Sequence, residues 1–213
     1  MEKVLYQVTN KKALSLKDLK ELGIDGLYVN NTVSKDLARL KKEAKSNNLE
    51  VISAKEFPFN QELATTILNE LTHSSAKKFT FVSKVENELD NQKINGLENN
   101  TFADQLILFQ ALALMSLLPG QLLIPAGLEG KRDSPSWDKL KGLLSLRKKY
   151  EFNGKSKINI TENNLLEVKH GKLIGYFNIS SNALGFNSTS KWIQNYLVGQ
   201  LLPKGVVIKE EEE

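Results

Sequence analysis

The sequence contains no cysteine, so it can form neither a disulfide bond nor a thiolate metal site. Its two histidines, His73 and His170, are isolated and leave no imidazole cluster for a metal ion. Three of its 29 basic residues are arginine, and the lysines are dispersed along the chain. A nucleic-acid-binding protein gathers its basic residues on one element and places aromatic residues among them. We therefore expect no metal, no other cofactor and no nucleic-acid partner.

Long apolar segments are missing as well. The most apolar stretch, residues 106–118, has no charge but is only 13 residues long, whereas a helix needs about 20 to cross a bilayer. This stretch predicts a core helix, and no membrane partner is expected. Residues 1–10 lack the apolar core of a signal peptide, so a cytoplasmic location is expected.

What is present is an ordinary globular composition. Of 213 residues, 40% are hydrophobic and 25% are charged, with a formal net charge of +4. A chain of this length buries enough apolar surface for one large domain, or for one domain with a smaller companion.

The first half of the chain alternates short apolar runs with amphipathic ones. Ser15 and Asp18 form a capping box at the start of a helix, and Gly23 is placed to end it with a left-handed cap. The pattern predicts strands over residues 4–8, 24–29, 49–53 and 79–85, and helices over residues 15–22, 33–46 and 61–71.

Residues 101–150 continue this alternation. An apolar helix is predicted over residues 102–118, and a buried strand over residues 122–127. Ser134-Pro135 then opens a second helix, with proline at the first helical position. Five strand–helix units in succession predict parallel strands covered by helices.

The pattern changes after residue 150. Short apolar runs separated by Asn163-Asn164, His170-Gly171 and residues 203–205 predict antiparallel hairpins. We interpret Trp192, Tyr196 and Leu197 as a helical patch packed on this sheet. The predicted domains are therefore a β/α domain, residues 1–150, and a small antiparallel β domain, residues 151–213.

The order of these elements resembles glycoside hydrolase family 13, the α-amylase family. Residues 118–129, LPGQLLIPAGLE, are similar to the family's L-P-G-x-P-x-I-Y-Y-G-x-E around its eighth strand, and residues 143–148, LLSLRK, resemble its last barrel helix. Residues 5–8 and 19–28 resemble the first strand and the entry to the second. The resemblance implies a TIM barrel with a C-terminal β domain, shortened here to about five parallel strands.

The family's catalytic segments have no counterpart in this sequence. Seven residues separate Leu71 from Phe79, which leaves no room for strands four to six. No arginine begins the R-x-D pattern of the nucleophile, and Glu88 and Leu89 stand where the resemblance would place His and Asp. Retaining hydrolysis needs two carboxyl groups across the sugar. The sequence therefore predicts no catalytic residues and a non-catalytic relative that acts by binding an oligosaccharide or a protein partner.

Six residues are candidates for the cleft of such a fold. Glu129 and Asp133 follow the fifth strand, and a solvated acidic loop is their simpler explanation. Glu56 and Glu86 follow the third and fourth strands, where a new acid/base pair would make the chain a glycosidase with relocated carboxylates. The rings of Tyr28 and Trp137 are placed to stack on a sugar, with core packing as the simpler explanation.

A shortened barrel leaves open sheet edges, which are prone to pairing. We expect either the β domain or a second copy of the chain, in a homodimer, to cover them. A further alternative is a structural subunit of a full-length amylase.

Overall fold

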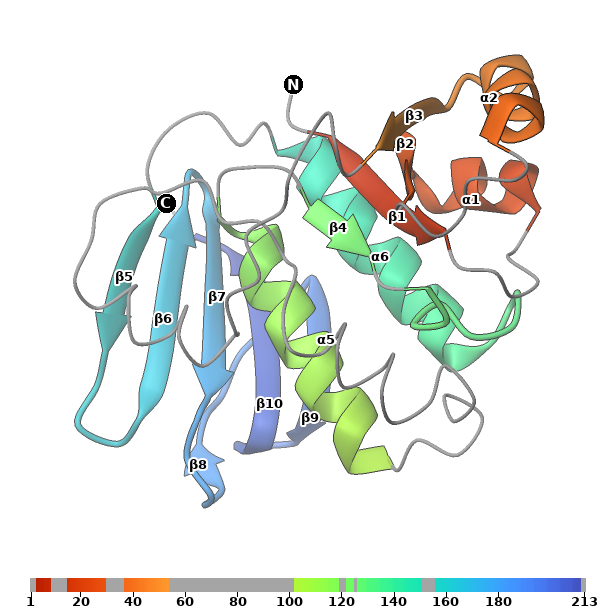
Figure 1. Ribbon diagram of the computed structural model, residues 1–213. Helices are drawn as coiled ribbons and strands as arrows, with labels where there is room; N and C mark the ends of the chain where they lie inside the picture. The colour runs from red at the N-terminus through yellow and green to blue at the C-terminus, as the bar shows by residue number, and fades with distance from the viewer. Residues whose placement is uncertain are drawn as a thin grey trace. The chain divides into compact units, whose positions relative to one another are not determined.

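Figure 1 shows the computed structural model of the chain, which describes residues 3–8, 15–29, 37–53, 102–118, 122–124, 126–150 and 156–211. Contacts divide the described residues into two units. The first, here called the parallel unit, contains the described residues up to 53 together with 122–145. The second, the antiparallel unit, contains residues 102–118 and the described residues from 146 onward. In the described part of the chain, no helix is long and apolar enough to span a membrane.

The parallel unit contains a four-stranded sheet among the described residues. Its strands are β1 (Val4–Val8), β2 (Gly26–Val29), β3 (Glu50–Ser53) and β4 (Leu122–Ile124), in the order β3-β2-β1-β4. All neighbouring strands are parallel. The predicted α/β organisation is therefore confirmed for these four strands. The predicted strand 79–85 and helix 61–71 lie outside the described residues.

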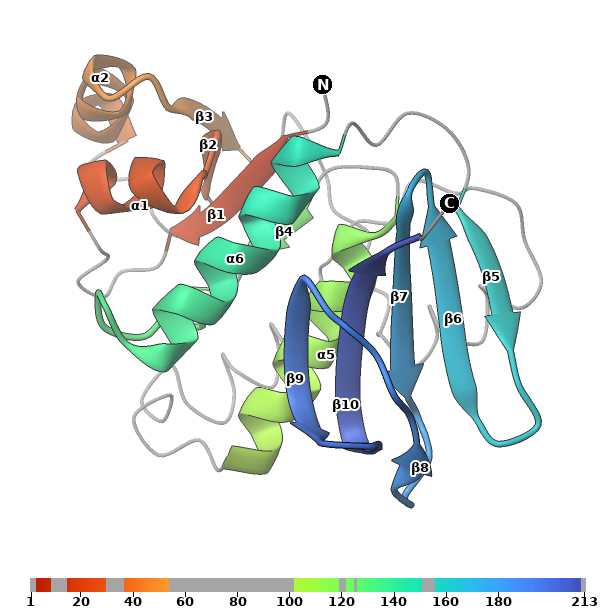
Figure 2. The same cartoon turned by 180° about the vertical axis from the view of Figure 1, so that it is seen from behind.

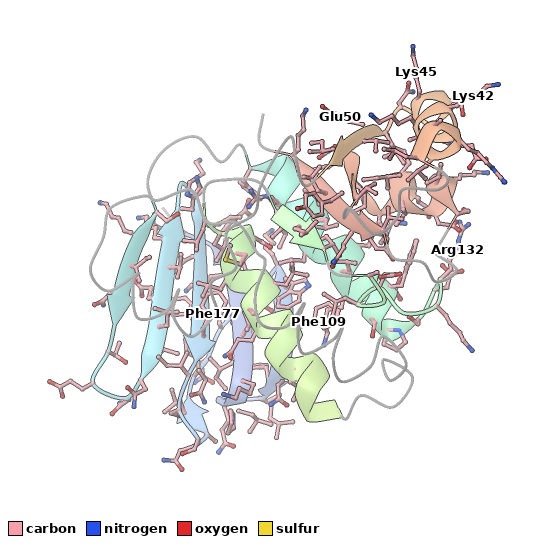
Figure 3. All side chains as sticks on the ribbon, viewed as in Figure 1. Lys42, Lys45, Glu50, Phe109, Arg132 and Phe177 are labelled. Carbon is pink, nitrogen blue, oxygen red and sulfur yellow. The ribbon has the colours of Figure 1, made fainter. Side chains whose placement is uncertain are left out.

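Local signals set the ends of the helices in this unit. α1 (Leu16–Leu22) begins where the Ser15 hydroxyl accepts a hydrogen bond from the Asp18 amide, and it ends at Gly23 with φ of 94°. α2 (Leu37–Ser46) follows β2, and its Lys42 and Lys45 point into solvent (Figure 3). The caps of α1 at Ser15 and Gly23 are the ones that the sequence predicts.

α6 (Pro135–Lys149) covers one face of this sheet. It lies behind β1 and β4 in Figure 1 and in front of them in Figure 2. Pro135 is its first residue, as predicted, and the Trp137 amide donates to the Ser134 hydroxyl at 3.3 Å. Trp137, Leu140 and Leu144 are buried, so the apolar side of the helix faces the sheet.

α6 lies beside α1. The Arg132 guanidinium, labelled in Figure 3, donates to Asp18 and to Glu21 of α1, each at 2.7 Å. Lys141 of α6 donates to Glu21 at 3.1 Å. The two helices therefore cover the same face of the sheet.

The antiparallel unit contains β5 (Lys157–Ile160), β6 (Leu165–His170), β7 (Leu173–Asn178), β8 (Leu184–Gly185), β9 (Trp192–Leu197) and β10 (Gln200–Glu210). The strand order is β5-β6-β7-β10-β8, with β9 also paired to β10. Every pairing is antiparallel, so the predicted C-terminal antiparallel sheet is confirmed.

α5 (Phe102–Ser116) packs on this sheet and belongs to the antiparallel unit. Gln110 donates to the carbonyl of Asn178 at 2.9 Å, and Gln194 donates to the carbonyl of Leu106 at 2.7 Å. The sequence pattern places this helix in the β/α domain, residues 1–150, whereas the contacts place it with the antiparallel sheet. Because its apolar residues surround the helix axis, periodicity does not tell which sheet it covers.

Two local interpretations near the end of the chain are wrong. Trp192, Tyr196 and Leu197 belong to strand β9, in which burial alternates between Trp192, Ile193 and Gln194 as a half-exposed strand requires. Residues 203–205 are not a hairpin turn but an irregularity inside β10, where the pairing register with β9 shifts between Leu201 and Val206. The backbone turns there because Lys204 has a φ of 61°.

Candidate functional site

Tyr6 of β1 and Glu129, in the turn after β4, form a buried hydrogen-bonded pair. Ile124 ends β4 and pairs with Tyr6 of β1, and the turn after β4 returns Glu129 toward that strand. The Tyr6 hydroxyl donates to Glu129 Oε1 at 2.7 Å, and the Gly127 amide donates to Glu129 Oε2 at 2.8 Å. Gly127 allows this turn because its φ is 93°. Both carboxylate oxygens therefore accept hydrogen bonds from within the fold.

The environment of this pair shifts both pKa values upward. Burial raises the pKa of Glu129, while the hydrogen bonds from Tyr6 and Gly127 lower it, and burial prevails. Burial also raises the pKa of Tyr6 far above its usual value, and the nearby negative charge of Glu129 adds to the effect. Tyr6 therefore keeps its proton at neutral pH and serves as a permanent donor to the carboxylate.

The burial and hydrogen bonds of Glu129 indicate that this residue stabilises the fold. Glu129 is 4% exposed and Tyr6 is 1% exposed. A substrate therefore cannot reach the Glu129 carboxylate unless the turn after β4 moves. The solvated acidic loop expected for Glu129 is wrong, because the turn after β4 folds inward instead of outward. Among the described residues, no group of three or more His, Asp or Glu side chains is placed to hold a metal ion.

The other candidates do not gather around Glu129 as an acidic site. The Asp133 side chain is 83% exposed, as a solvated loop predicts, and lies 3.9 Å from the Arg132 guanidinium. Tyr28 and Trp137 are buried, at 4% and 1% exposure, so neither presents a ring for stacking and the core-packing explanation holds. Glu56 and Glu86 lie outside the described residues, and their role stays a prediction.

Sequence reasoning missed Tyr6 as the partner of Glu129. The signal that would have found it is the alternation of β1 combined with the pairing of β1 and β4. That pairing follows from tertiary structure, because 123 residues separate the two side chains in the sequence.

Ser156 and His170 form a second polar contact, in the antiparallel unit. Ser156 Oγ lies 2.8 Å from His170 Nδ1 and donates to the carbonyl of Leu117 at 2.7 Å. Since the serine proton is directed at that carbonyl, Nδ1 of the imidazole carries the proton between the two side chains. An activated nucleophile needs the opposite arrangement, in which the base accepts the serine proton. Ser156 therefore fastens the start of β5 to the end of α5 through the Leu117 carbonyl and to β6 through His170.

A polar recess lies at the end of β10. It has a volume of about 310 Å³ and is lined by Thr189, Ser190, Lys191, Lys209, Glu210 and Glu211. The lining combines hydroxyl groups, ammonium groups and carboxylates. Unlike the Tyr6–Glu129 pair, this recess opens to solvent and offers groups that can bind a polar molecule.

The comparisons with known proteins give no family for this chain. No model of a protein family matches the sequence, and no curated protein matches it.

Proposed function

We propose that this chain is a non-catalytic relative of the α-amylase family that acts by binding carbohydrate. Support for the scaffold comes from the parallel sheet, in which the last described strand, β4, pairs with the first, β1. A barrel closes through such a pairing of its last and first strands. The placement of α1 and α6 on one face, joined by Arg132, is also what the outer layer of a barrel requires.

The burial of Glu129 and the hydrogen bonds to both its oxygens support the proposal that the chain is non-catalytic. Glycoside hydrolysis needs a carboxyl group that protonates the leaving oxygen and a second that attacks or activates water, with the first in reach of the substrate. Glu129 is buried, and each of its oxygens accepts a hydrogen bond from the fold. Asp133, the other acidic candidate in the same loop, is exposed and does not share its surroundings.

A hydrolysis assay tests this proposal. The full chain is incubated with maltodextrin and with 4-nitrophenyl α-glucoside, and the release of reducing ends and of nitrophenol is followed. We expect no turnover above the buffer rate. Turnover that Glu56→Gln or Glu86→Gln abolishes would overturn the proposal in favour of a glycosidase with relocated carboxylates.

We also propose that a second copy of the chain covers exposed sheet edges, as the shortened scaffold suggests. Open edges with unpaired backbone groups favour association. Sedimentation velocity at micromolar concentration should give the mass of a dimer, and a monomer at that concentration would remove this part of the proposal.

A further inference from the structure

We infer that the recess at the end of β10 binds a small polyhydroxylated molecule with an anionic group, of the class of sugar acids and sugar phosphates. This inference rests on the proposed carbohydrate binding and names its site and the charge of its ligand. Four features of the antiparallel unit support it: a fixed wall, an excess of lysine, hydroxyl groups and a neighbouring aromatic pair.

Backbone hydrogen bonds fix the walls of the recess. The Lys191 amide donates to the Ile208 carbonyl at 2.8 Å and holds residues 189–191 against β10. The Glu211 amide donates to the Lys172 carbonyl at 2.7 Å and holds the other wall against the β6–β7 turn. A ligand therefore meets a site that is already formed, which lowers the entropy cost of binding.

The two carboxylates of the recess already have lysine partners. Glu210 pairs with Lys191 at 3.0 Å and with Lys149 at 3.7 Å. Glu211 pairs with Lys169. Two of these lysines, Lys149 and Lys169, approach from outside the recess, so the carboxylates are neutralised without using Lys209.

Lys209 remains available for an anion. In the described part of the chain it makes no ion pair, and its ammonium lies 5.6 Å from the centre of the Tyr176 ring. The neighbourhood contains Lys149, Lys169, Lys191 and Lys209. Among the described residues, these four lysines face three carboxylates, those of Glu210, Glu211 and Glu167, and the negative charge of Glu167 acts on Tyr176. Within the described ranges, the lysine without a carboxylate partner is therefore one that lines the recess.

The remaining groups fit a sugar better than a bare anion. Thr189 and Ser190 supply hydroxyl groups that donate to and accept from sugar hydroxyls. Tyr176, in contact with Lys209, packs against Phe186 in a tilted arrangement, with ring centres 4.9 Å apart and an angle of 55° between the ring planes, and offers aromatic surface beside the recess. A volume of about 310 Å³ is at the lower end of ligand sites, which suits a single sugar unit.

The sheet register provides a matched control. Lys157, Lys169 and Lys209 occupy one row across β5, β6, β7 and β10, because Lys157 pairs with Lys169, Lys169 with Ile174, and Ile174 with Lys209. These side chains project from the same face of the sheet. Lys157 is exposed and does not line the recess, so Lys157→Gln removes the same charge from the same face.

Titration calorimetry with glucuronate and glucose 6-phosphate tests the inference, with glucose and inorganic phosphate for comparison. We expect both anionic sugars to bind more tightly than either comparison compound. Lys209→Gln should weaken their binding by about tenfold, the usual effect of losing one charge-assisted hydrogen bond, and Lys157→Gln should leave it unchanged. Ser190→Phe, which fills the recess without changing the charge, should abolish binding, and circular dichroism shows whether each variant folds.

Three results would overturn the inference: binding of neither anionic sugar, equal weakening by Lys209→Gln and Lys157→Gln, or phosphate binding as tight as that of glucose 6-phosphate. None of these three results changes what the hydrolysis assay says about catalysis. Conversely, turnover of maltodextrin would overturn the non-catalytic proposal even if the recess binds an anionic sugar, so the two failures are distinguishable.

Discussion

The hydroxyl of Tyr6 donates a 2.7 Å hydrogen bond to Oε1 of Glu129, although 123 residues separate the two in the sequence. The bond joins the first strand of the parallel sheet to the turn that follows its last described strand. A buried carboxylate is costly unless donors surround it, so this bond stabilises the turn in its inward conformation.

Replacing Tyr6 by phenylalanine removes the donor and leaves the ring in place. We expect Tyr6→Phe to lower the free energy of unfolding by about 1–3 kcal/mol at pH 7, because a buried carboxylate loses one of its partners. Urea denaturation measures the change. Tyr196→Phe is the control, since the Tyr196 hydroxyl accepts only a 3.4 Å bond from the Gly199 amide. Equal losses in the two variants would show that the Tyr6–Glu129 bond contributes nothing specific.

The raised pKa of Glu129 predicts how its contribution varies with pH. Its pKa in the folded chain lies above the ordinary 4.5, so between these two values the folded chain binds more protons than the unfolded chain. The contribution of Glu129 to stability therefore falls as pH rises through this interval. Glutamine does not titrate. The free energy of unfolding of Glu129→Gln, minus that of the wild type, should increase as pH rises above 4.5, and a difference that is independent of pH would contradict the raised pKa.

Arg147 caps the end of α5. Its Nη1 donates to the carbonyls of Met115, Ser116 and Leu118 at 3.3, 2.9 and 3.1 Å, and the residue is 6% exposed. These carbonyls lie at the negative end of the helix dipole, where a buried cation is favourable.

Arg147→Ala should therefore lower the free energy of unfolding by about 2–4 kcal/mol, because buried carbonyls lose their donor. Arg147→Lys should recover part of this loss, since a lysine keeps the charge without the planar guanidinium. Arg39→Ala is the control: its side chain is 77% exposed and pairs with Glu43, so a change below about 0.5 kcal/mol is expected. Chemical denaturation of the three variants gives the comparison, and a similar effect at Arg39 and Arg147 would argue against the cap.

Gly175 sets the distance between β7 and the end of α5. A Cβ at this position would overlap Leu117 Cδ1 and would lie 2.8 Å from Phe177 Cε2. Gly175→Ala should lower the free energy of unfolding by about 1–3 kcal/mol through overpacking.

A double-mutant cycle separates this steric cause from others. Leu117→Ala removes the atom in the closest contact, so the alanine at position 175 should cost less in the double variant than in the wild-type background. Additive costs would show that the contact with Leu117 is not the origin of the strain.

Much of the fold was predictable because its signals are local. Ser15, Asp18 and Gly23 mark the two ends of α1, and Ser134-Pro135 marks the start of α6, as predicted. Asn164 and Gly171 make the turns of the antiparallel sheet in the left-handed conformation, with φ of 58° and 57°. Each signal acts within a few residues, because a cap or a turn is decided by neighbouring backbone groups.

The candidate site was less predictable. Glu129 was identified from its place after a strand, but its inward direction and its partner Tyr6 were not. Lys209 and the recess gave no signal in the sequence, since a lysine followed by glutamates at the end of a strand is an ordinary surface pattern. The grouping of α5 with the C-terminal sheet was also missed, because an evenly apolar helix carries no information about which surface it covers.

By itself, then, the sequence determined the two ends of α1, the start of α6, the parallel and antiparallel character of the two sheets, and the absence of thiolate chemistry. Only the tertiary structure decided which sheet α5 covers, which hydroxyl donates to the buried Glu129, and which lysine lacks a carboxylate partner among the described residues. The reason is physical: secondary structure follows from interactions between residues close in sequence, whereas burial, charge balance and site geometry depend on contacts between residues that only folding brings together.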